Sequence, residues 1–567
     1  MSFTRPYPWE RSYPEGVRWD APIATGVVPA ILDQSADTYG GNPALEYRDR
    51  RISYRELAEL SQRAAEGLRR LGVTRGTPVA LYLPNTPYHP IAFFGALRLG
   101  ARVVHLSPLD AERELAYKLK DSGARTIVTT NFPTMLPRAQ KLLQEGHVDR
   151  LIVGDDAKWG APPAPLEGFA ESDAVLSFER LLANAPSSDF PEIGTEDIAV
   201  LQYTGGTTGT PKGAMLTHGN LTAAVSMYSA WQAGQGFSQP GTERVICVLP
   251  LFHIYALTSV MLRAIQAGNE LLLRPRFDTE TTLHDIEVKR ATAFPGVPTM
   301  WIALNAVPGI EKCDLSSLKY CYSGGAPLPV EVAQRFERLT GHSIRGGWGM
   351  TESSPAGTNL PYRGYVKPGT IGLPLPGIVI DVVAIDDPTR VRGFGEIGEM
   401  RIKGPNVFKG YWNRPEETAA CFAGEFFLTG DIVYMEEDGY LFLVDRKKDM
   451  IISGGFNVYP QVVEQAIYEH FDVEEAMVIG VPDAYRGEAA KAFIKLRVSA
   501  AELTLEALHA FLADKVGKHA MPAALELRPA LPRTPVGKLS KKELIEEERQ
   551  KREAANAAPE LLKRARS

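Results

Sequence analysis

The sequence predicts a multi-domain α/β protein. Short runs rich in β-branched residues alternate with amphipathic helical patterns through the first two-thirds of the chain. Such alternation is typical of parallel or mixed sheets covered by helices. The length of 567 residues corresponds to about three or four domains. Hydrophobic residues make up 44% and charged residues 23% of the chain, which is ordinary globular usage and excludes general disorder.

The clearest strand and helix patterns lie in the N-terminal part of the chain. Apolar runs at residues 77–83, 125–130 and 150–154 predict strands, and residues 53–71 predict an amphipathic helix. Residues 155–191 are rich in Ala, Pro, Gly and Asp, so we expect an irregular surface segment there.

Residues 245–262 require a choice between two interpretations. They contain no Asp, Glu, Lys or Arg and are just long enough to suggest a membrane span. However, Pro250 and His253 lie inside the segment. We therefore interpret it as a buried strand that ends at Pro250, followed by a helix.

The pattern changes twice in the C-terminal third. After about residue 380 the chain has short strands and glycine turns, as at residues 395–404. A charged segment of five residues, 445–449, is the candidate interdomain linker. A compact set of strands and helices follows it to about residue 545. Residues 541–567 mix Lys, Arg and Glu at helical spacing, which predicts a solvated helix that frays at its end.

The composition excludes several classes of protein. Lys and Arg number 62 against 68 Asp and Glu, for a net charge of −6, which argues against a protein that coats nucleic acid. Four cysteines without a CxxC pair do not support a disulfide framework or a structural zinc site. The first 30 residues carry no apolar core of a signal peptide. We expect a cytoplasmic protein with at most peripheral membrane contact.

The strongest local signal is Tyr203-Thr-Gly-Gly-Thr-Thr-Gly-Thr-Pro-Lys-Gly213, which follows a predicted strand at residues 198–202. Glycines let the backbone bend around an anion, while threonine hydroxyls and a lysine add donors and positive charge. The segment therefore predicts a phosphate-binding loop. It is not a Walker loop, because Pro211 precedes Lys212 and Gly213 follows it. A flexible Gly/Thr hairpin is the alternative interpretation.

Seven further motifs lie along the chain: Leu249-Pro-Leu-Phe-His-Ile-Tyr255, Ser323-Gly-Gly-Ala-Pro327, Gly347-Trp-Gly-Met-Thr-Glu352, Leu428-Thr-Gly-Asp431, Asp445-Arg-Lys-Lys-Asp449, Ser453-Gly-Gly-Phe-Asn457 and Pro535-Val-Gly-Lys538. With the loop, they resemble in type and order the motifs of the adenylate-forming (ANL) superfamily, which includes acyl-CoA synthetases, luciferases and the adenylation domains of peptide synthetases. The chain is most similar to bacterial fatty-acid–CoA ligases. It also resembles the pimelate, or dicarboxylate, branch of CoA ligases.

The resemblance runs from about residue 30 to about residue 545 and implies an architecture. A large N-terminal domain, residues 1–447, would contain two α/β subdomains and a β-barrel-like subdomain and would bind AMP and the acyl group. A small mobile α+β domain, residues 448–567, would carry the catalytic lysine.

The resemblance also implies a two-step reaction. A carboxylate is first joined to AMP with loss of pyrophosphate, and a thiolate then displaces AMP, so ATP and CoA are the expected co-substrates. The first step brings a carboxylate against a triphosphate, and cations and fixed dipoles must offset their repulsion. The implied cofactor is Mg²⁺ at Thr204 and Glu352, since Mg²⁺ prefers oxygen ligands. For Glu352 alone, a helix-capping carboxylate is the alternative.

Several positions are implied as nucleotide ligands. Asp431 would accept hydrogen bonds from both ribose hydroxyls, Arg446 would lie near the same ribose, and Trp348 would line the adenine slot where the family often has Tyr. Gly455 would be needed for the pantetheine tunnel, where a Cβ could block the path. The full implied set is Thr204, Gly205, Gly206, Thr207, Thr208, Gly209, Lys212, Gly325, Ala326, Pro327, Trp348, Gly349, Thr351, Asp431, Arg446 and Gly455.

Three residues are implied as catalytic. Lys538 would reach from the small domain to stabilise charge shared by the carboxylate, ribose and α-phosphate, although an exposed lysine in a turn is the alternative. Lys448 would be the hinge between the two domain arrangements. His253 would orient or gate the carboxylate, and a buried structural histidine is the equal alternative. The context of Lys538 also resembles an acetylation site, which implies a lysine acetyltransferase and deacetylase as partners.

The sequence leaves more than one class of acid substrate open. Residues 255–262 and 293–299 are apolar and suit the walls of a pocket for medium or long acyl chains. A dicarboxylic acid would need a cation at the far end, and Arg263 is a candidate. Other classes are an adenylation module that loads a carrier protein, an NTPase that forms ADP, and a non-enzymatic binding protein. The first of these usually has an acid near the histidine, which is absent at residues 251–256.

Overall fold

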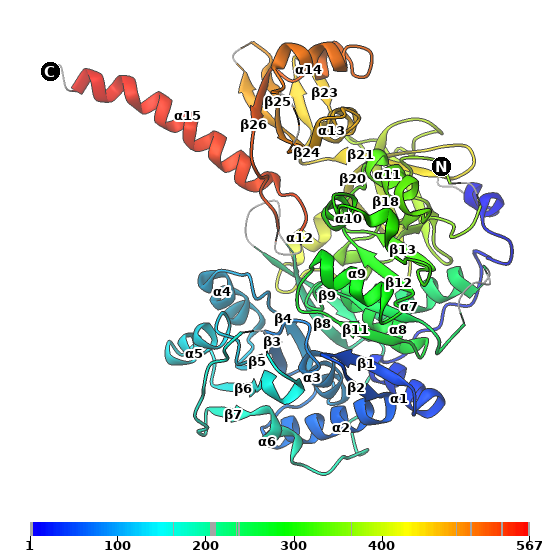
Figure 1. The fold of residues 1–567 in the computed structure, drawn as a ribbon, viewed down its shortest axis with the longest axis vertical. Coiled ribbons are helices and arrows are strands. Elements are labelled where there is room, and N and C mark those ends of the chain that lie inside the picture. Colours follow the sequence, from blue (N-terminus) through cyan, green and yellow to red (C-terminus); the bar gives the residue numbers. More distant parts are fainter. Residues whose placement is uncertain are drawn as a thin grey trace.

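The computed structural model describes residues 4–162, 164–204, 211–233, 235, 239–364, 366–483, 485–498, 500, 502–534 and 537–564, with side chains described as far as residue 553. Figure 1 shows a large α/β part and a smaller C-terminal part beside it, from which the last helix extends away. The predicted α/β class, with a large N-terminal domain and a small C-terminal domain, is confirmed.

The first sheet of the large part contains the strands that the sequence predicts at residues 77–83, 125–130, 150–154 and 198–202. All neighbouring strands are parallel except for the final hairpin. That hairpin carries the phosphate-loop motif between its strands. In spatial order the strands are β7 (Val175–Ser177), β6 (Arg150–Gly154), β5 (Thr126–Thr130), β3 (Pro78–Leu81), β4 (Arg102–His105), β8 (Ile198–Thr204) and β9 (Lys212–Thr217).

The second sheet has the same plan. Its strands are parallel except for one antiparallel hairpin at the edge. In spatial order they are β14 (Ile344–Gly346), β13 (Tyr320–Ser323), β12 (Ala293–Gly296), β10 (Arg244–Cys247), β11 (Glu270–Leu273), β1 (Pro43–Tyr47) and β2 (Arg50–Ser53).

Helices cover these two sheets, as expected for parallel strands. Ser53 caps the helix predicted at residues 53–71, since its hydroxyl accepts the Glu56 N–H at 3.2 Å. The helices are α1 (Val28–Tyr39), α2 (Tyr54–Arg70), α3 (Tyr88–Arg98), α4 (Glu112–Ser122), α5 (Leu136–Gln144), α6 (Phe178–Leu182), α7 (His218–Ala233), α8 (Arg263–Gln266), α9 (Thr279–Glu287), α10 (Pro298–Asn305), α11 (Val330–Thr340) and α12 (Pro415–Ala420). Short helical turns are η1 (Pro8–Ser12), η2 (Asp156–Trp159), η4 (Ile310–Lys312) and η5 (Thr351–Ser353), and η3 (Tyr255–Leu262) is a π-helix.

One continuous group of buried hydrophobic side chains joins both sheets. It includes Val79 and Val103 from the first sheet and Leu271 and Leu272 from the second. Because this core is shared, the loops at the ends of the two sets of strands are held in fixed relation to each other.

A third, antiparallel sheet completes the large part. Its strands are β17 (Val379–Val383), β18 (Gly398–Lys403), β20 (Phe426–Met435), β19 (Phe422–Ala423) and β21 (Leu441–Arg446). A separate pair is formed by β15 (Thr358–Asn359) and β16 (Leu373–Pro374).

The small C-terminal part has its own hydrophobic core. Its elements are β22 (Ile451–Ser453), β23 (Phe456–Val458), α13 (Pro460–Tyr468), β24 (Val473–Asp483), β25 (Gly487–Leu496), α14 (Leu505–Leu512), η6 (Lys518–Ala520), β26 (Ala524–Leu527) and α15 (Lys541–Arg564). The predicted C-terminal helix is thus α15. The domain boundary at residue 447 stays a prediction, and a turn lies there between β21 and β22.

Two expectations from the sequence need correction. Residues 155–191 are not wholly irregular, because β7 pairs in parallel with β6 and leads into α6. The strand predicted to end at Pro250 ends at Cys247 instead, since a buried asparagine from another loop holds the backbone after it. Among the described residues, no helix combines the length and apolar character that crossing a membrane requires.

Candidate active site

The segment before His253 is held by Asn85, a buried residue in the loop after β3. Its Nδ2 donates to the carbonyl oxygens of Cys247 at 3.0 Å and Leu249 at 2.8 Å. Its Oδ1 accepts the Leu251 N–H at 2.8 Å. Because this one buried amide bonds to three backbone groups, the path from β10 to η3 is fixed without regular secondary structure.

A second buried amide holds the next residue. Gln202 Nε2, near the end of β8, donates to the Phe252 carbonyl at 2.8 Å. Its Oε1 lies 3.1 Å from Nδ1 of His105, whose Nε2 lies 3.2 Å from Nε2 of His89. Burial lowers the pKa of His105 to about 4, so this chain of side chains is uncharged near neutral pH and acts as polar packing.

His253 itself is a neutral side chain near neutral pH. Burial, together with the Lys538 ammonium, lowers its pKa to about 3. Nδ1 accepts the Tyr255 N–H at 3.2 Å. The ring proton therefore lies on Nε2, which can donate to an acceptor in the site.

Lys538 lies against the loop that follows β13. A Cβ placed on Gly325 would lie 2.6 Å from Cε and 3.0 Å from Nζ of Lys538, and the φ of Gly325 is +81°. Thr299 at the start of α10 donates to the Gly537 carbonyl at 2.7 Å. Burial and the nearby Arg446 guanidinium lower the pKa of Lys538 to about 8. The small part thus places a lysine at the large part, and its predicted catalytic role stays a prediction.

Asp431 and Arg446 form the adjoining part of the site. Arg446 Nε donates to Asp431 Oδ1 at 2.8 Å, and the indole of Trp348 donates to Asp431 Oδ2 at 2.7 Å. Asp431 is 2% exposed, and each of its oxygens keeps a further lone pair for a ligand hydroxyl. Trp348 therefore has a specific bond at the position where a tyrosine is more usual, beyond the flat surface expected from the sequence.

The remaining predicted adenine-side residues lie on two neighbouring loops. Ala326 and Pro327 follow β13, beside Gly325. Thr351 opens η5, and Gly349 precedes it. A Cβ on Gly349 would lie 1.4 Å from the Pro355 carbonyl oxygen, so only glycine fits there.

Glu352 is buried and bonded to a tyrosine. The Tyr411 hydroxyl donates to its Oε1 at 2.7 Å. Among the described residues, this is the one side chain to which Glu352 bonds. Burial raises the pKa of this carboxyl. Nζ of Lys212, which pairs with Glu417, lies over the Tyr411 ring, 5.2 Å from its centroid. Thr204 faces Lys212 across the β8–β9 hairpin.

Some predicted residues do not join this group. Gly205, Gly206, Thr207, Thr208 and Gly209 lie outside the described residues. Lys448 is exposed in the turn after β21, and Gly455 is exposed in the turn between β22 and β23, with open space around the position of a Cβ. Their predicted roles, in a second domain arrangement, stay predictions.

The comparisons with known proteins agree with this geometry. The AMP-binding enzyme description matches residues 32–412, and the description of the AMP-binding enzyme C-terminal domain matches residues 462–538. This chain belongs to the AMP-binding enzyme family. It is 38% identical over 555 residues to a long-chain-fatty-acid–CoA ligase of Bacillus subtilis (strain 168), with 95% of this chain and 98% of that protein covered.

Two solved structures of one related protein bear on the state of this AMP-binding enzyme. ATP-bound MatB from Rhodopseudomonas palustris has a TM-score of 0.82 at 29% identity, covering 92% of this chain and 99% of that chain. Apo MatB from the same organism, with the same coverage, has a TM-score of 0.74 at 28% identity. The structure described here is thus more similar to the ATP-bound form, in agreement with Lys538 lying at Gly325.

The site also fits the magnesium ion that the family implies. A buried carboxylate that bonds to one tyrosine hydroxyl keeps lone pairs that suit a hard cation. The described residues include no cluster of three or more His, Cys, Asp or Glu side chains arranged for a metal. A single carboxylate with a hydroxyl suits an ion whose other ligands are phosphate oxygens and water.

Sequence reasoning missed several residues of the site. Tyr411 occurs in a segment with no distinctive pattern, so only the fold could reveal it. Thr299 ends the apolar segment 293–299, but its bond to Gly537 could not be read from the sequence. Asn85 and Gln202 did leave a signal, because each is a polar amide at the end of an apolar strand. Buried amides of this kind must bond to something, but the sequence does not say to what.

Proposed function

We propose that this AMP-binding enzyme is an ATP-dependent acid–CoA ligase acting on medium- to long-chain fatty acids, with acyl-CoA, AMP and pyrophosphate as products. The observation that carries the proposal is the approach of Lys538 to Gly325, beside Asp431 and Arg446. It brings a cation from the small part to the residues of the large part that are expected to bind the nucleotide. The Bacillus subtilis relative, a long-chain-fatty-acid–CoA ligase, supports the acyl substrate.

In the proposed first step, a carboxylate oxygen of the acid forms a bond to the α-phosphorus of ATP, and the bond to the pyrophosphate oxygen breaks. The ammonium of Lys538 stabilises negative charge as the two anions meet. Asp431 accepts the ribose hydroxyls and fixes the nucleotide, while Nε2–H of His253 donates to the carboxylate and orients it.

Thr204 and Glu352 would hold Mg²⁺ together with the phosphates. When bound, the ion supplies positive charge that offsets the repulsion between the acid and the triphosphate. Tyr411 keeps the Glu352 carboxylate in position through its hydroxyl, and Lys212 adds a second positive charge on the same side.

In the proposed second step, the CoA thiolate attacks the acyl carbonyl carbon and AMP leaves with the bonding electron pair. The small domain, taken as residues 448–567, turns about Lys448 and brings Gly455 to the acyl group. The same movement takes Lys538 out of the site.

We also propose a cytoplasmic reaction, because ATP and CoA are cytoplasmic metabolites. Acetylation of Lys538 would remove the catalytic charge, and mass spectrometry of protein from its native cell tests whether it occurs.

Half-reaction assays of Lys538→Ala test the proposal. We expect wild-type enzyme to release pyrophosphate from ATP with fatty acids, and the variant to lose this step by about 10²- to 10³-fold, the usual effect of removing one preorganised charge donor. Thioester formation from supplied acyl-adenylate should be largely retained.

Lys515→Ala, which removes a lysine of the same part that pairs with Glu469, is the matched control. Equal loss of both half-reactions in Lys538→Ala would contradict the assigned role of this lysine. Failure of wild-type enzyme to release pyrophosphate with any acid would contradict the proposed function itself.

A further inference from the structure

Gln202 is a buried amide in the strand that leads to the phosphate-loop motif. The residue is 5% exposed. In the hairpin of β8 and β9 it pairs with Ala214, two positions before the pair of Thr204 and Lys212. Side chains two positions apart in a strand project from the same face, about 7 Å apart. Gln202 therefore lies on the same face of β8 as Thr204, which is expected to bind Mg²⁺.

The other end of the Gln202 side chain reaches the segment around His253. Nε2 of Gln202 donates to the Phe252 carbonyl at 2.8 Å. The N–H of the same peptide group, which belongs to His253, donates to the Pro250 carbonyl at 2.9 Å. Nδ1 of the histidine ring accepts the Tyr255 N–H at 3.2 Å. Since this peptide group is held on both sides and the ring is held at Nδ1, Nε2 of His253 has a defined position.

The hydrogen bonds that lead to Gln202 can run in only one direction. A carbonyl oxygen accepts, so the amide nitrogen of Gln202 must face Phe252, and Oε1 must face His105. Because Oε1 also accepts, Nδ1 of His105 carries its proton. Burial lowers the pKa of both His105 and His89, so each ring is neutral near pH 7. His89 Nε2–H then donates to Nε2 of His105, 3.2 Å away. The chain therefore fixes which end of the Gln202 amide faces Phe252.

This chain of side chains is buried throughout. His89 is 0% exposed and His105 is 3% exposed, and Nδ1 of His89 has no hydrogen-bond partner within the described part of the chain. Burying polar groups costs free energy unless all of them are paired, and apolar side chains could fill the same space without this cost. A buried polar chain holds its members in one arrangement, which indicates that the orientation of Gln202 matters.

Asn85 and Gln202 hold the same segment in different ways. The bonds of Asn85 end at Leu251, and Asn85 lies in the loop after β3, which carries no residue expected to bind phosphate. Gln202 holds the next carbonyl along the chain, and its own strand continues into the phosphate-loop motif. Gln202 therefore joins the segment that is expected to orient the acid directly to the strand that is expected to hold the triphosphate.

We propose that Gln202 is a positioning residue for adenylation: it fixes His253, and with it the carboxylate of the acid, relative to the triphosphate held by the hairpin of β8 and β9. The inference rests on the proposed ligase activity and adds a residue to it. The carboxylate oxygen and the α-phosphorus must approach to about 3–3.5 Å, and a shift of about 1 Å can lower the rate by about 100-fold. Removal of the Gln202 amide should thus slow the chemical step more than it weakens substrate binding.

Single-turnover release of pyrophosphate from ATP and decanoate, without CoA, isolates the adenylation step. Gln202→Met keeps an unbranched side chain and loses both bonds of the amide. Asn305→Leu is the matched control: Nδ2 of the buried Asn305 donates to the Val332 carbonyl at 2.9 Å, so this variant loses the same kind of bond between α10 and α11. The rate constant at saturating substrate, the half-saturating concentration of each substrate and the Tm are measured for each protein.

We expect Gln202→Met to lower the rate constant by about 10- to 100-fold. The half-saturating concentration of ATP should change by less than about twofold, because the pair of Asp431 and Arg446 is untouched. Asn305→Leu should lower the Tm by a similar amount and leave the rate constant unchanged. If Gln202 only stabilised the fold, the two variants would show the same small effect on the rate constant.

A double-mutant cycle with His253→Ala tests whether Gln202 acts through His253. In the His253→Ala background, Gln202→Met should change the rate constant by less than about twofold, because losses are not additive for residues that act as one unit. Fully additive losses would contradict a positioning role through His253.

The remaining results are distinct. A wild-type rate constant in Gln202→Met overturns the inference while the ligase activity stands. If wild-type protein releases no pyrophosphate with any acid, the proposed function fails and the inference fails with it. Should Gln202→Met not fold, Gln202→Asn decides, since its amide is one methylene group shorter and loses at least one of the bonds to His105 and Phe252. Its rate constant should fall with ATP binding unchanged, and a wild-type value overturns the proposal.

Discussion

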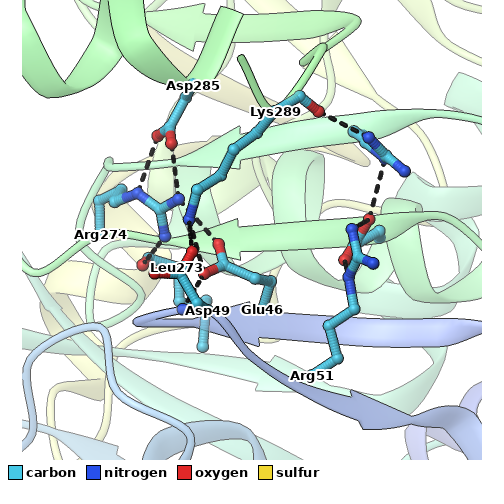
Figure 2. Close-up of polar contacts among 9 residues, drawn as sticks. Glu46, Asp49, Arg51, Leu273, Arg274, Asp285 and Lys289 are labelled. Atoms are coloured by element: carbon cyan, nitrogen blue, oxygen red, sulfur yellow. Dashed lines mark hydrogen bonds and ion pairs between the residues drawn. The ribbon is translucent and has the colours of Figure 1, made fainter. Parts of the chain in front are cut away.

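Two arginines inside the large part have contrasting surroundings. Arg274, at the end of β11, donates from Nε and Nη2 to both oxygens of Asp285, at 2.8 and 2.7 Å, and from Nη2 to Glu46 at 2.7 Å. Figure 2 shows this side chain between two carboxylates that come from α9 and β1. Arg263 has no carboxylate partner among the described residues.

The contrast extends to the neighbours of each arginine. Next to Arg274, Lys289 bridges Glu46 at 2.9 Å and Asp49 at 2.7 Å, as Figure 2 shows, and Arg51 pairs with Glu270 at 2.6 Å. Near Arg263 the described partners are tyrosines and amides.

The difference separates charges that serve folding from charges that serve a ligand. A buried cation that is balanced within the chain holds elements together, and its removal leaves buried anions behind. Lys538 resembles Arg263 rather than Arg274, since no described carboxylate pairs with its Nζ. Burying an unbalanced charge is costly, so we take these two unbalanced cations as candidate positions for anionic groups.

The largest expected effect concerns Arg274. Arg274→Met should lower the free energy of unfolding by about 3–5 kcal/mol, because Asp285 is left as a buried charge without its cation. Urea denaturation of the large domain measures this loss. Arg125→Met, which breaks an exposed pair, should cost at most about 1 kcal/mol. A similar small loss for Arg274→Met would mean that the cluster does not contribute to folding as described.

The second prediction concerns the charge of Lys538. Its pKa of about 8 lies below that of an ordinary lysine, so the ammonium is lost as the pH rises through 8. Since kcat/KM reports the free enzyme, kcat/KM for adenylation should fall about tenfold per pH unit above that value. Lys538→Arg, which does not titrate in this range, should be slower but flat. A wild-type profile that stays level to the ordinary pKa of lysine would rule out this assignment.

The smallest expected effect on stability concerns Arg263. Arg263→Met should change the free energy of unfolding by less than about 1 kcal/mol, because it removes a cation that no described acid balances. The same urea titration as for Arg274→Met makes the two variants directly comparable. A loss as large as that of Arg274→Met would assign Arg263 to folding and remove the basis of the contrast.

The sequence predicts local features of this fold better than connections between distant segments. Residues 53–71 predict α2, because apolar residues recur at helical spacing after Ser53, which caps the helix. β7 was missed, because a strand of three residues at a sheet edge depends on its partner β6 more than on its own composition.

The same distinction applies to the site. Motifs point to Asp431, Lys538 and Glu352, because each lies in a short segment with a distinctive composition. No motif shows that Trp348 donates to Asp431, or that Tyr411 binds Glu352. These contacts join residues 83 and 59 positions apart, a separation at which only the folded chain determines which side chains meet.

Asn85 has a consequence for the order of events in catalysis. Its three bonds tie the segment before η3 to the framework of the two sheets, whereas Lys538 belongs to the small part, which we propose turns away. In the proposed cycle, the acyl group therefore stays bound at the same place in the large part, while the small part changes which of its residues lie next to it. The intermediate does not need to travel: the second reactant is brought to it.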